Sequence, residues 1–312
     1  MTAMNLSQAR VVSPVLPGVA QGLHNAELIG DALFPFVPVE QRAGKIISFG
    51  KEDFFLYSGG RAPGSNTKRV SFGYSGSEFT LMQFALEGIV PFEILQEAAK
   101  GPGINQRKRA EAGVLRIVLL NLEKLQADLA LNAGNYPTAN KASLGGSSLW
   151  SDPLSSDPLA DVETGKEAIR RQTGRYPNTL MLSAQTAKAL RVHADIIDLI
   201  KYTGRGVAWT NLFADLFGVE RVVIGGAVYA DSTGALVDIW GKAAVLAFTE
   251  LGAVADMGLP SYGYTYRLDG CPLVETPYED RPKKSWVCPV TDELSPVIAS
   301  AGAGYLISPA VA

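Results

Sequence analysis

The stretch that decides the fold is Trp150 to Tyr202, WSDPLSSDPLADVETGKEAIRRQTGRYPNTLMLSAQTAKALRVHADIIDLIKY. Asp161 is predicted to be a helix N-cap, and Glu163 then lies in the first turn, where the helix dipole favours an acid. Gly174 and Pro177 predict the end of that helix. The stretch therefore predicts regular structure and indicates no chemistry.

A strand and a second helix are predicted after the first helix. Thr179 to Leu182 is a short apolar run, and Ser183 is placed to cap a helix from Ala184 to His193. The same stretch contains the aspartates Asp152, Asp157 and Asp161, but their spacing does not match a calcium-binding loop. We expect no metal site there.

The sequence resembles the major capsid proteins of tailed bacteriophages. Within the deciding stretch the resemblance depends on the WSDP opening, the second Asp-Pro, TGRYPNTL and the closing IIDLIKY. Further similar segments follow in the family's order: LFADLFGVERVVIGGAV (Leu212 to Val228), DIWGKAAVLAF (Asp238 to Phe248), PSYGYTYRLDG (Pro260 to Gly270) and AGYLI (Ala303 to Ile307). Their order and spacing together carry the resemblance, because no single piece is a strict signature.

This resemblance implies an α+β class chain with the HK-ninety-seven-like phage capsid fold. The parts it implies are an N-terminal arm (1–42), an extended hairpin loop or E-loop (43–82), a spine helix with a peripheral-domain segment (83–159), an axial α/β domain (160–256) and C-terminal peripheral-domain strands (257–312).

Composition limits the classes of partner. A formal net charge of -3 over 312 residues argues against holding nucleic acid by clustered positive charge. The N-terminus lacks an apolar signal core and no uncharged run is long enough to cross a bilayer, so we expect no membrane partner. We expect Cys271 and Cys288 to be reduced thiols.

Two N-terminal regions are predicted to contact other subunits. Prolines exclude long helices from residues 1–42, and the apolar side chains there favour an arm that packs on a neighbour. Residues 43–82 are typical of a long hairpin, which has too little apolar burial to be stable alone. Its cationic tip and an acidic cluster elsewhere are candidate partners. The predicted contact residues are Leu33, Phe34 and Phe36 in the arm, Arg61, Lys68 and Arg69 at the tip, and Glu275, Glu279 and Asp280 in the acidic cluster.

A long helix is predicted from Asn105 to Leu131 by apolar residues at helical spacing. The predicted apolar face consists of Val114, Ile117, Val118, Leu122, Leu125 and Leu129. Pairs of opposite charge four residues apart, Arg107 with Glu111 and Lys124 with Asp128, support the helix. The basic residues at its start are either a solvated face or a surface that faces packaged DNA: Arg107, Lys108 and Arg109.

The second half of the chain is predicted to be mixed α/β and then β. Thr210 is expected to cap a short helix that Gly218 closes, and strands are expected at Arg221 to Val228, Leu236 to Trp240 and Ala243 to Phe248. The remainder, Pro260 to Ile307, is expected to be strands that prolines interrupt. The interrupting prolines are Pro272, Pro277, Pro282 and Pro289.

A search for catalytic or cofactor chemistry gives no candidate. The two histidines, His24 and His193, lie in unrelated segments, and we expect His193 to be a partly exposed residue at a helix end. The glycines of VVIGGAV precede another strand, so they do not form a dinucleotide fingerprint. We therefore expect no enzyme activity and no cofactor.

The function indicated is that of a major capsid protein, a structural protein of the virion that is assembled in the host cytoplasm. The expected partners are other copies in hexamers and pentamers, a separate scaffolding protein, a portal, possible decoration proteins and packaged double-stranded DNA bound without sequence specificity. The N-terminus is expected near Met1 or Thr2. No residue context marks Lys45, Lys51 or Lys68 for covalent crosslinking. The alternatives are an encapsulin-type shell protein and, third, a soluble α/β enzyme.

Overall fold

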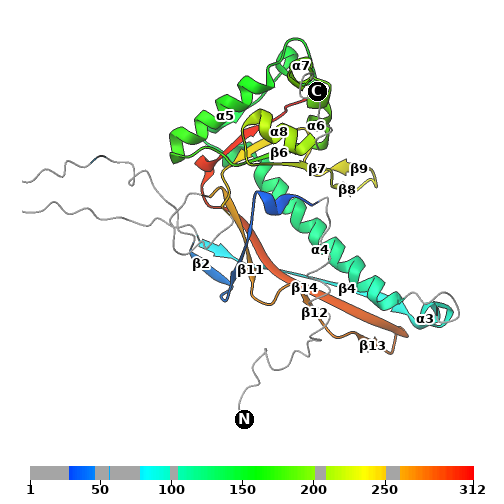
Figure 1. Cartoon of the computed structure of the whole chain (residues 1–312). Helices are drawn as coiled ribbons and strands as arrows, with labels where there is room; N and C mark the ends of the chain where they lie inside the picture. The colour runs from blue at the N-terminus through cyan, green and yellow to red at the C-terminus, as the bar shows by residue number, and fades with distance from the viewer. Residues whose placement is uncertain (1–27, 46–55, 57–77, 99–104, 201–208, 251–260) are drawn as a thin grey trace, which may run out of the picture.

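The computed structural model describes residues 28–45, 56, 78–98, 105–200, 209–250 and 261–312. A long helix connects two regions (Figure 1). At one end is an α/β region built on a five-stranded sheet, and along the other end of the helix lies an extended six-stranded sheet. The mixed helix and strand content agrees with the predicted α+β class.

The described helices of seven or more residues are α3 Phe92–Ala98, α4 Gln106–Leu131, α5 Pro158–Thr173, α6 Ala184–Arg191, α7 Ala194–Ile200 and α8 Trp209–Phe217. Short 3-10 turns are η1 Gly30–Ala32, η3 Ala133–Asn135, η4 Thr138–Asn140, η5 Gly146–Ser148 and η6 Ala301–Ala303. The described strands are β1 Phe36–Val39, β2 Ala43–Lys45, β3 Glu78–Thr80, β4 Met82–Pro91, β5 Lys141–Ala142, β6 Thr179–Ser183, β7 Arg221–Gly225, β8 Val228–Ala230, β9 Leu236–Asp238, β10 Ala244–Ala247, β11 Gly263–Leu268, β12 Leu273–Val274, β13 Tyr278–Asp280, β14 Ser285–Ile298 and β15 Gly304–Ile307.

The five-stranded sheet has the order β5-β15-β10-β6-β7 and is buried on both faces. Leu180 and Leu182 of β6 join the apolar cluster that contains residues of α5 and α8, whereas Met181 joins the cluster on the other face, with Trp240. A strand covered on both faces is a continuous apolar run without alternation, as the sequence predicted for residues 179–182. β15, near the C-terminus, pairs with β10 in this sheet. The last strand of residues 257–312, which were expected to form peripheral-domain strands, therefore belongs to the five-stranded sheet.

The N-cap of α5 is Asp157 and not the predicted Asp161. Asp157 caps α5, because its side chain accepts a hydrogen bond from the Ala160 amide at 3.0 Å, and Pro158 occupies the first helical position. Asp161 instead accepts from the Trp150 indole at 2.8 Å. Gly174 ends the helix in the left-handed conformation, as predicted.

The bounds of α6 and α8 also differ by one or two residues from the predicted bounds. Ser183 caps α6 as predicted, with its side chain accepting from the Thr186 amide, but the helix ends at Arg191 and not at His193. Thr210 is not a cap, because α8 already begins at Trp209. Gly218 follows α8 with a φ of 59°, in agreement with its predicted role.

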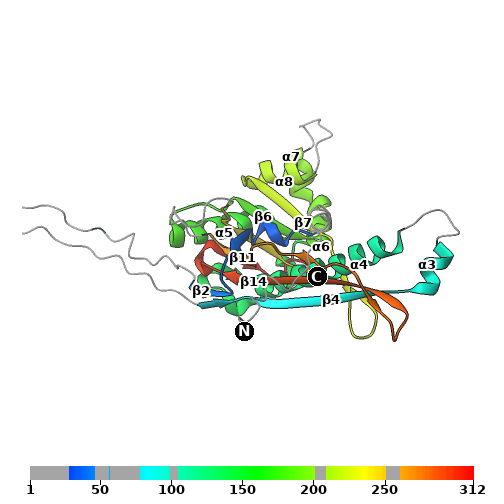
Figure 2. The same ribbon diagram turned by 90° about the horizontal axis from the view of Figure 1, so that it is seen from below.

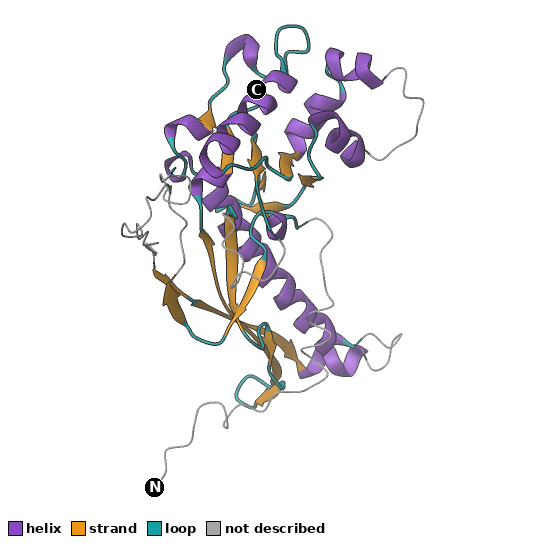
Figure 3. Ribbon diagram, turned by 60° about the vertical axis from the view of Figure 1, so that its left-hand side comes forward, coloured by secondary structure: helices purple, strands orange, loops and turns teal. Residues whose placement is uncertain are grey.

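α4 is the long helix expected over residues 105–131, and it is seen along its length in Figure 3. Asn105 caps it, because its side chain accepts a hydrogen bond from the Lys108 amide. Of its predicted apolar face, Val114, Val118 and Leu122 are buried, but Ile117 is 52% exposed. The helix rotates its buried side along its length as it passes from the six-stranded to the five-stranded sheet, so a single stripe is a poor description. Lys124 forms the predicted ion pair with Asp128.

The six-stranded sheet has the order β1-β11-β14-β12, with β13 and β4 also paired to β14. β14 continues through Pro289. The prediction that this proline interrupts a strand is therefore wrong. The Pro289 carbonyl accepts from the Glu275 amide at 3.1 Å, on the side of β14 away from β4. A proline is tolerated there because its missing N–H would not have been needed for pairing with β4.

The predicted contact residues Leu33 and Phe34 are instead part of the chain's own core, with 0% exposure. η1 and β1 carry them into that core, since β1 pairs in parallel with β11. Glu123 of α4 holds the start of this segment by accepting from the Ile29 and Gly30 amides at 3.0 and 2.8 Å. A segment held in this way cannot offer these two side chains to a neighbour.

Candidate assembly surfaces

The root of the predicted hairpin is present as two short antiparallel strands. β2 pairs with β3, with Ala43 opposite Thr80 and Lys45 opposite Glu78. Phe79 of β3 is buried, stacks on Tyr266 with 4.2 Å between ring centroids, and lies where a side chain at Gly44 would have to be. The root of the predicted hairpin is therefore anchored in the subunit by an aromatic pair. Its predicted tip, with Arg61, Lys68 and Arg69, lies outside the described residues.

A bidentate ion pair fixes the same root to the six-stranded sheet. The Arg42 guanidinium donates to both carboxylate oxygens of Glu293 on β14, at 2.6 and 3.0 Å. Gln83 donates a further hydrogen bond to Glu293 at 3.2 Å. The side chain of Glu293 is 4% exposed and that of Arg42 is 69% exposed, so the acid is fixed and the base covers it. The hydrogen bond from this partner raises the pKa of Arg42 above its usual value.

β4 runs along the outer border of the molecule beside β14 (Figure 2). Several of its large apolar side chains are exposed, namely Met82 at 58%, Leu86 at 38% and Ile89 at 53%. Ile94 of α3 and Ile117 of α4 are also exposed, at 47% and 52%. Exposed apolar residues gathered along one strand and its neighbours are typical of an interaction surface.

The three basic residues at the start of α4 do not behave as one group. All are exposed, but the Arg107 guanidinium lies 4.9 Å from the centroid of the Trp286 ring on β14. It therefore packs on its own subunit and does not form the predicted ion pair with Glu111. Lys108 and Arg109 remain as exposed cations in the first turn.

The predicted acidic cluster is divided between two environments. Glu279 and Asp280 lie on β13, and Asp280 forms an ion pair with Lys283 at 3.6 Å. Glu275 precedes β13 and accepts from the Thr291 hydroxyl at 3.4 Å. Of the three, Glu279 is the exposed one. The turn before β14 adds Arg281, Lys283 and Lys284, so this acidic patch lies against a basic one.

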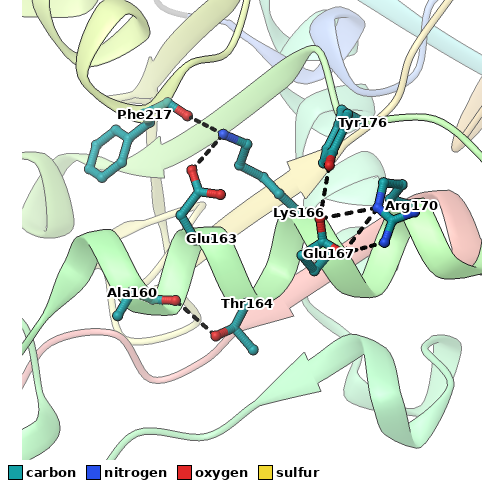
Figure 4. Close-up of polar contacts among 8 residues, drawn as sticks. All are labelled: Ala160, Glu163, Thr164, Lys166, Glu167, Arg170, Tyr176 and Phe217. Atoms are coloured by element: carbon teal, nitrogen blue, oxygen red, sulfur yellow. Dashed lines mark hydrogen bonds and ion pairs between the residues drawn. The ribbon is translucent and has the colours of Figure 1, made fainter.

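The outer face of α5 has a dense set of polar contacts that connect elements of the same chain (Figure 4). Lys166 donates to Glu163 and to the carbonyl of Phe217 at the end of α8. Glu167 accepts from Arg170 and from Tyr176, and these bonds lower the pKa of Glu167 from 4.5 to about 2. Each polar side chain drawn has at least one hydrogen-bond partner within the chain, so these contacts stabilise α5.

His193 is fully buried, which contradicts its predicted exposure at a helix end. Its Nε2 lies 3.0 Å from the Ser156 hydroxyl, and that hydroxyl donates to the Asp152 carbonyl at 2.6 Å. Because the hydroxyl proton is used there, Nε2 must carry the imidazole hydrogen. The residue joins the loop before α5 to the corner between α6 and α7, which is a structural role.

Metal ligands, membrane spans and reactive thiols can be checked in the part of the chain that the structure describes. No three metal-ligating side chains gather there, and none of the helices there has the length and apolar character of a membrane span. Cys271 and Cys288 are free thiols, and burial raises the pKa of Cys288 to about 11, so this sulfur is a poor nucleophile.

Comparison with known proteins decides the family. The chain is 39% identical over 307 residues to the major capsid protein of Burkholderia phage BcepMu. The aligned region covers 97% of this chain and 98% of that protein. The chain belongs to the major capsid protein family of bacteriophages. Its role is thus that of a structural protein of the virion capsid, and this identity favours a phage protein over the encapsulin and enzyme alternatives. No general family model matches the sequence.

Solved structures support the fold of this capsid protein. The crystal structure of a phage-related protein from Bordetella bronchiseptica RB50 matches with a TM-score of 0.79 and 42% identity, over 97% of this chain and 98% of that one. The capsid structure of cyanophage P-SCSP1u matches with a TM-score of 0.58 at 9% identity, over 98% and 92% of the two chains. The HK-ninety-seven-like fold is therefore shown.

Two features of the capsid protein's surface were not predicted from sequence. One is the Arg42–Glu293 pair, which joins residues 251 positions apart and leaves no local pattern. The other is β4, for which a signal exists, because Met82, Phe84 and Leu86 alternate with Gln83, Ala85 and Glu87. This alternation is typical of a strand with two different faces.

Proposed function

We propose that copies of this chain form the hexamers and pentamers of an icosahedral shell that encloses the double-stranded DNA genome of a tailed phage. The observation that carries the proposal is β4, an exposed, apolar, ten-residue strand without a second described neighbour, in a chain of the capsid family. Electron microscopy of the purified protein tests it. Closed particles, tubes or capsomer rings are expected, and a monodisperse monomer at high concentration would contradict the proposal.

The hairpin tip and the acids of β13 and of the segment before it are proposed to meet between subunits. Arg61, Lys68 and Arg69 supply the cations. Among the acids, Glu279 carries most of the attraction, because Asp280 already pairs with Lys283 and Glu275 bonds to Thr291. Phe36 of the arm is a further contact candidate, since it is 39% exposed.

Charge reversal tests this contact. The double variant Arg61→Glu, Lys68→Glu should give malformed or fewer particles, whereas the charge-conserving control Arg61→Lys should assemble normally. Restoration of assembly by Glu279→Lys in the reversed background would identify the acid. Normal shells from the double variant would exclude the contact.

Further partners belong to the same proposal. A separate scaffolding protein, a portal and decoration proteins would act at the outside or inside of the shell, and packaged DNA would lie against Lys108 and Arg109, with Arg107 held on Trp286. Contacts of this kind are to phosphates and carry no sequence information. We propose shells without covalent crosslinks, so denaturing gels of mature particles should show monomers and no ladder of oligomers.

A further inference from the structure

His193 has one ring nitrogen that the hydrogen bonds of the chain do not use. The imidazole is fully buried, and its Nε2–H donates to the Ser156 hydroxyl at 3.0 Å. The other nitrogen, Nδ1, therefore carries a lone pair, and no group of the described residues donates a hydrogen bond to it. A buried polar atom without a partner costs free energy, and the chain recovers that cost when Nδ1 enters a hydrogen bond.

The acid beside this nitrogen shows what it can bind. An oxygen of the Asp195 carboxylate, in the first turn of α7, lies 3.8 Å from Nδ1. In the neutral ring a lone pair faces this negative charge, and no hydrogen bond joins the two atoms. A proton on Nδ1 converts the pair into a charge-assisted hydrogen bond after a movement of about 1 Å. The Asp195 side chain is 58% exposed, so it has room for this movement.

The other charged groups around the imidazole do not replace Asp195. Within the described chain, Asp195 is the acid that lies within ion-pair distance of the ring. Arg191 is directed elsewhere, because its guanidinium lies 5.7 Å from the centroid of the Trp209 ring. The end of α6 and the start of α7 meet at His193, and their dipoles act on a charge there in opposite directions. The charged residues on the surrounding elements are Asp195 and Asp198 on α7, Lys188 and Arg191 on α6, and Asp152 and Asp157 in the loop before α5.

We propose that His193 and Asp195 form a proton-dependent ion pair at the corner between α6 and α7. In acid solution Nδ1 takes up a proton and the imidazolium binds the Asp195 carboxylate, and at higher pH the proton leaves and the pair separates. Histidine is the side chain that ordinarily changes its charge between pH 5 and 8. α7 carries Ile197 and Leu199, which are 46% and 51% exposed, so the pair controls how firmly the subunit holds this apolar surface. This switch goes beyond the proposed function and does not depend on it.

Asp195→Asn tests the pair without changing the buried ring. At pH 8 the introduced amide can donate to the lone pair on Nδ1, so the variant should be at least as stable as the wild type. At pH 5 the amide cannot bind the imidazolium as a carboxylate does, and the unfolding equilibrium constant of the variant should exceed that of the wild type by about two- to fivefold. The stability from the pair is therefore present at pH 5 and lost as the pH rises to 8. Urea unfolding at the two pH values measures both constants.

Asp198→Asn is the matched control. It removes the same charge from another exposed position of α7, but Asp198 is not within ion-pair distance of His193. The ratio of its unfolding constant to that of the wild type should be equal at pH 5 and pH 8. The proposal would be overturned by a ratio for Asp195→Asn that is also constant over this interval, or by one that falls toward pH 5.

Discussion

The five-stranded sheet and the six-stranded sheet differ in how much of their surface the subunit itself buries. In the first, β6, β10 and β15 are buried along their whole length between two apolar clusters. In the second, β4 has six exposed residues and three partly buried ones among its ten, and its outer edge has no described neighbour. The difference indicates that one region supplies the stability of the subunit and the other supplies its capacity to associate.

The sharpest test of this division is a pair of leucine truncations. Leu182→Ala in β6 should reduce the free energy of unfolding by about 2–5 kcal/mol, because a fully buried leucine leaves a cavity. Leu86→Ala in β4 should cost the subunit about 1 kcal/mol or less, since the side chain is already 38% exposed, and should reduce assembly instead. Urea unfolding and electron microscopy separate the two effects. An equal loss of subunit stability would remove the distinction between the regions.

The connection between the regions should respond to pH through Glu123. This carboxylate accepts from the Trp240 indole at 2.6 Å as well as from Ile29 and Gly30, and burial raises its pKa above the ordinary 4.5. The folded state therefore holds the proton more tightly than the unfolded chain. The resulting stability is full below pH 4.5 and is lost as pH rises through the folded pKa.

Glu123→Gln should abolish this pH dependence and cost about 1–3 kcal/mol, because an amide offers one acceptor oxygen to three donors. Urea unfolding at several pH values measures both. The difference between variant and wild type should shrink as the pH rises above 4.5. A constant difference would mean that Glu123 does not titrate in this interval.

A smaller and local effect is expected at the hairpin root. Arg42→Ala removes the bidentate pair with Glu293 and should speed hydrogen exchange of the Leu81 amide, which donates to the Arg42 carbonyl. Arg42→Lys should lie between the variant and the wild type, since a lysine can make part of the contact. Unchanged exchange in Arg42→Ala would show that the Phe79–Tyr266 stack holds the root alone.

The smallest effect is expected on the outer face of α5. Hydrogen bonds from Arg170 and Tyr176 lower the pKa of Glu167 to about 2, so its contribution to stability is present above pH 4.5 and is lost as pH falls toward about 2. Glu167→Gln should change stability little at neutral pH and should flatten the acid side of the profile. A large loss of stability at neutral pH would show that these exposed contacts stabilise the subunit more than exposed ion pairs usually do.

The sequence predicted the local elements well where caps and apolar periodicity act together. The long helix, the strand after Gly174 and the cap at Ser183 follow from short-range physics. Asp161 was wrong as a cap because Asp157 precedes a proline and competes for the same helix start, and only the fold brings Trp150 to Asp161. Resemblance to the family supplied the architecture that these local signals could not.

Long-range contacts explain what the sequence could not predict. Leu33 and Phe34 are apolar residues in a proline-rich segment, so the sequence predicts a contact arm. They are buried in the core, because Glu123 accepts hydrogen bonds from the amides at the start of their segment. Pro289 looks like a strand breaker, and it is harmless because its N–H position faces away from β4. Burial of His193 depends on Ser156, which is 37 residues away.

The β8–β9 ribbon is the simplest place to enlarge this molecule. Asp231 closes its turn by accepting from the amides of Thr233 and Ala235, and Gly234 takes a φ of 83° there. A turn that satisfies its own polar groups depends little on the residues around it, and lengthening a surface loop carries a small entropic cost. A foreign peptide grafted between Thr233 and Gly234 should therefore leave the fold of the subunit intact, which makes this turn suited to carrying an inserted tag.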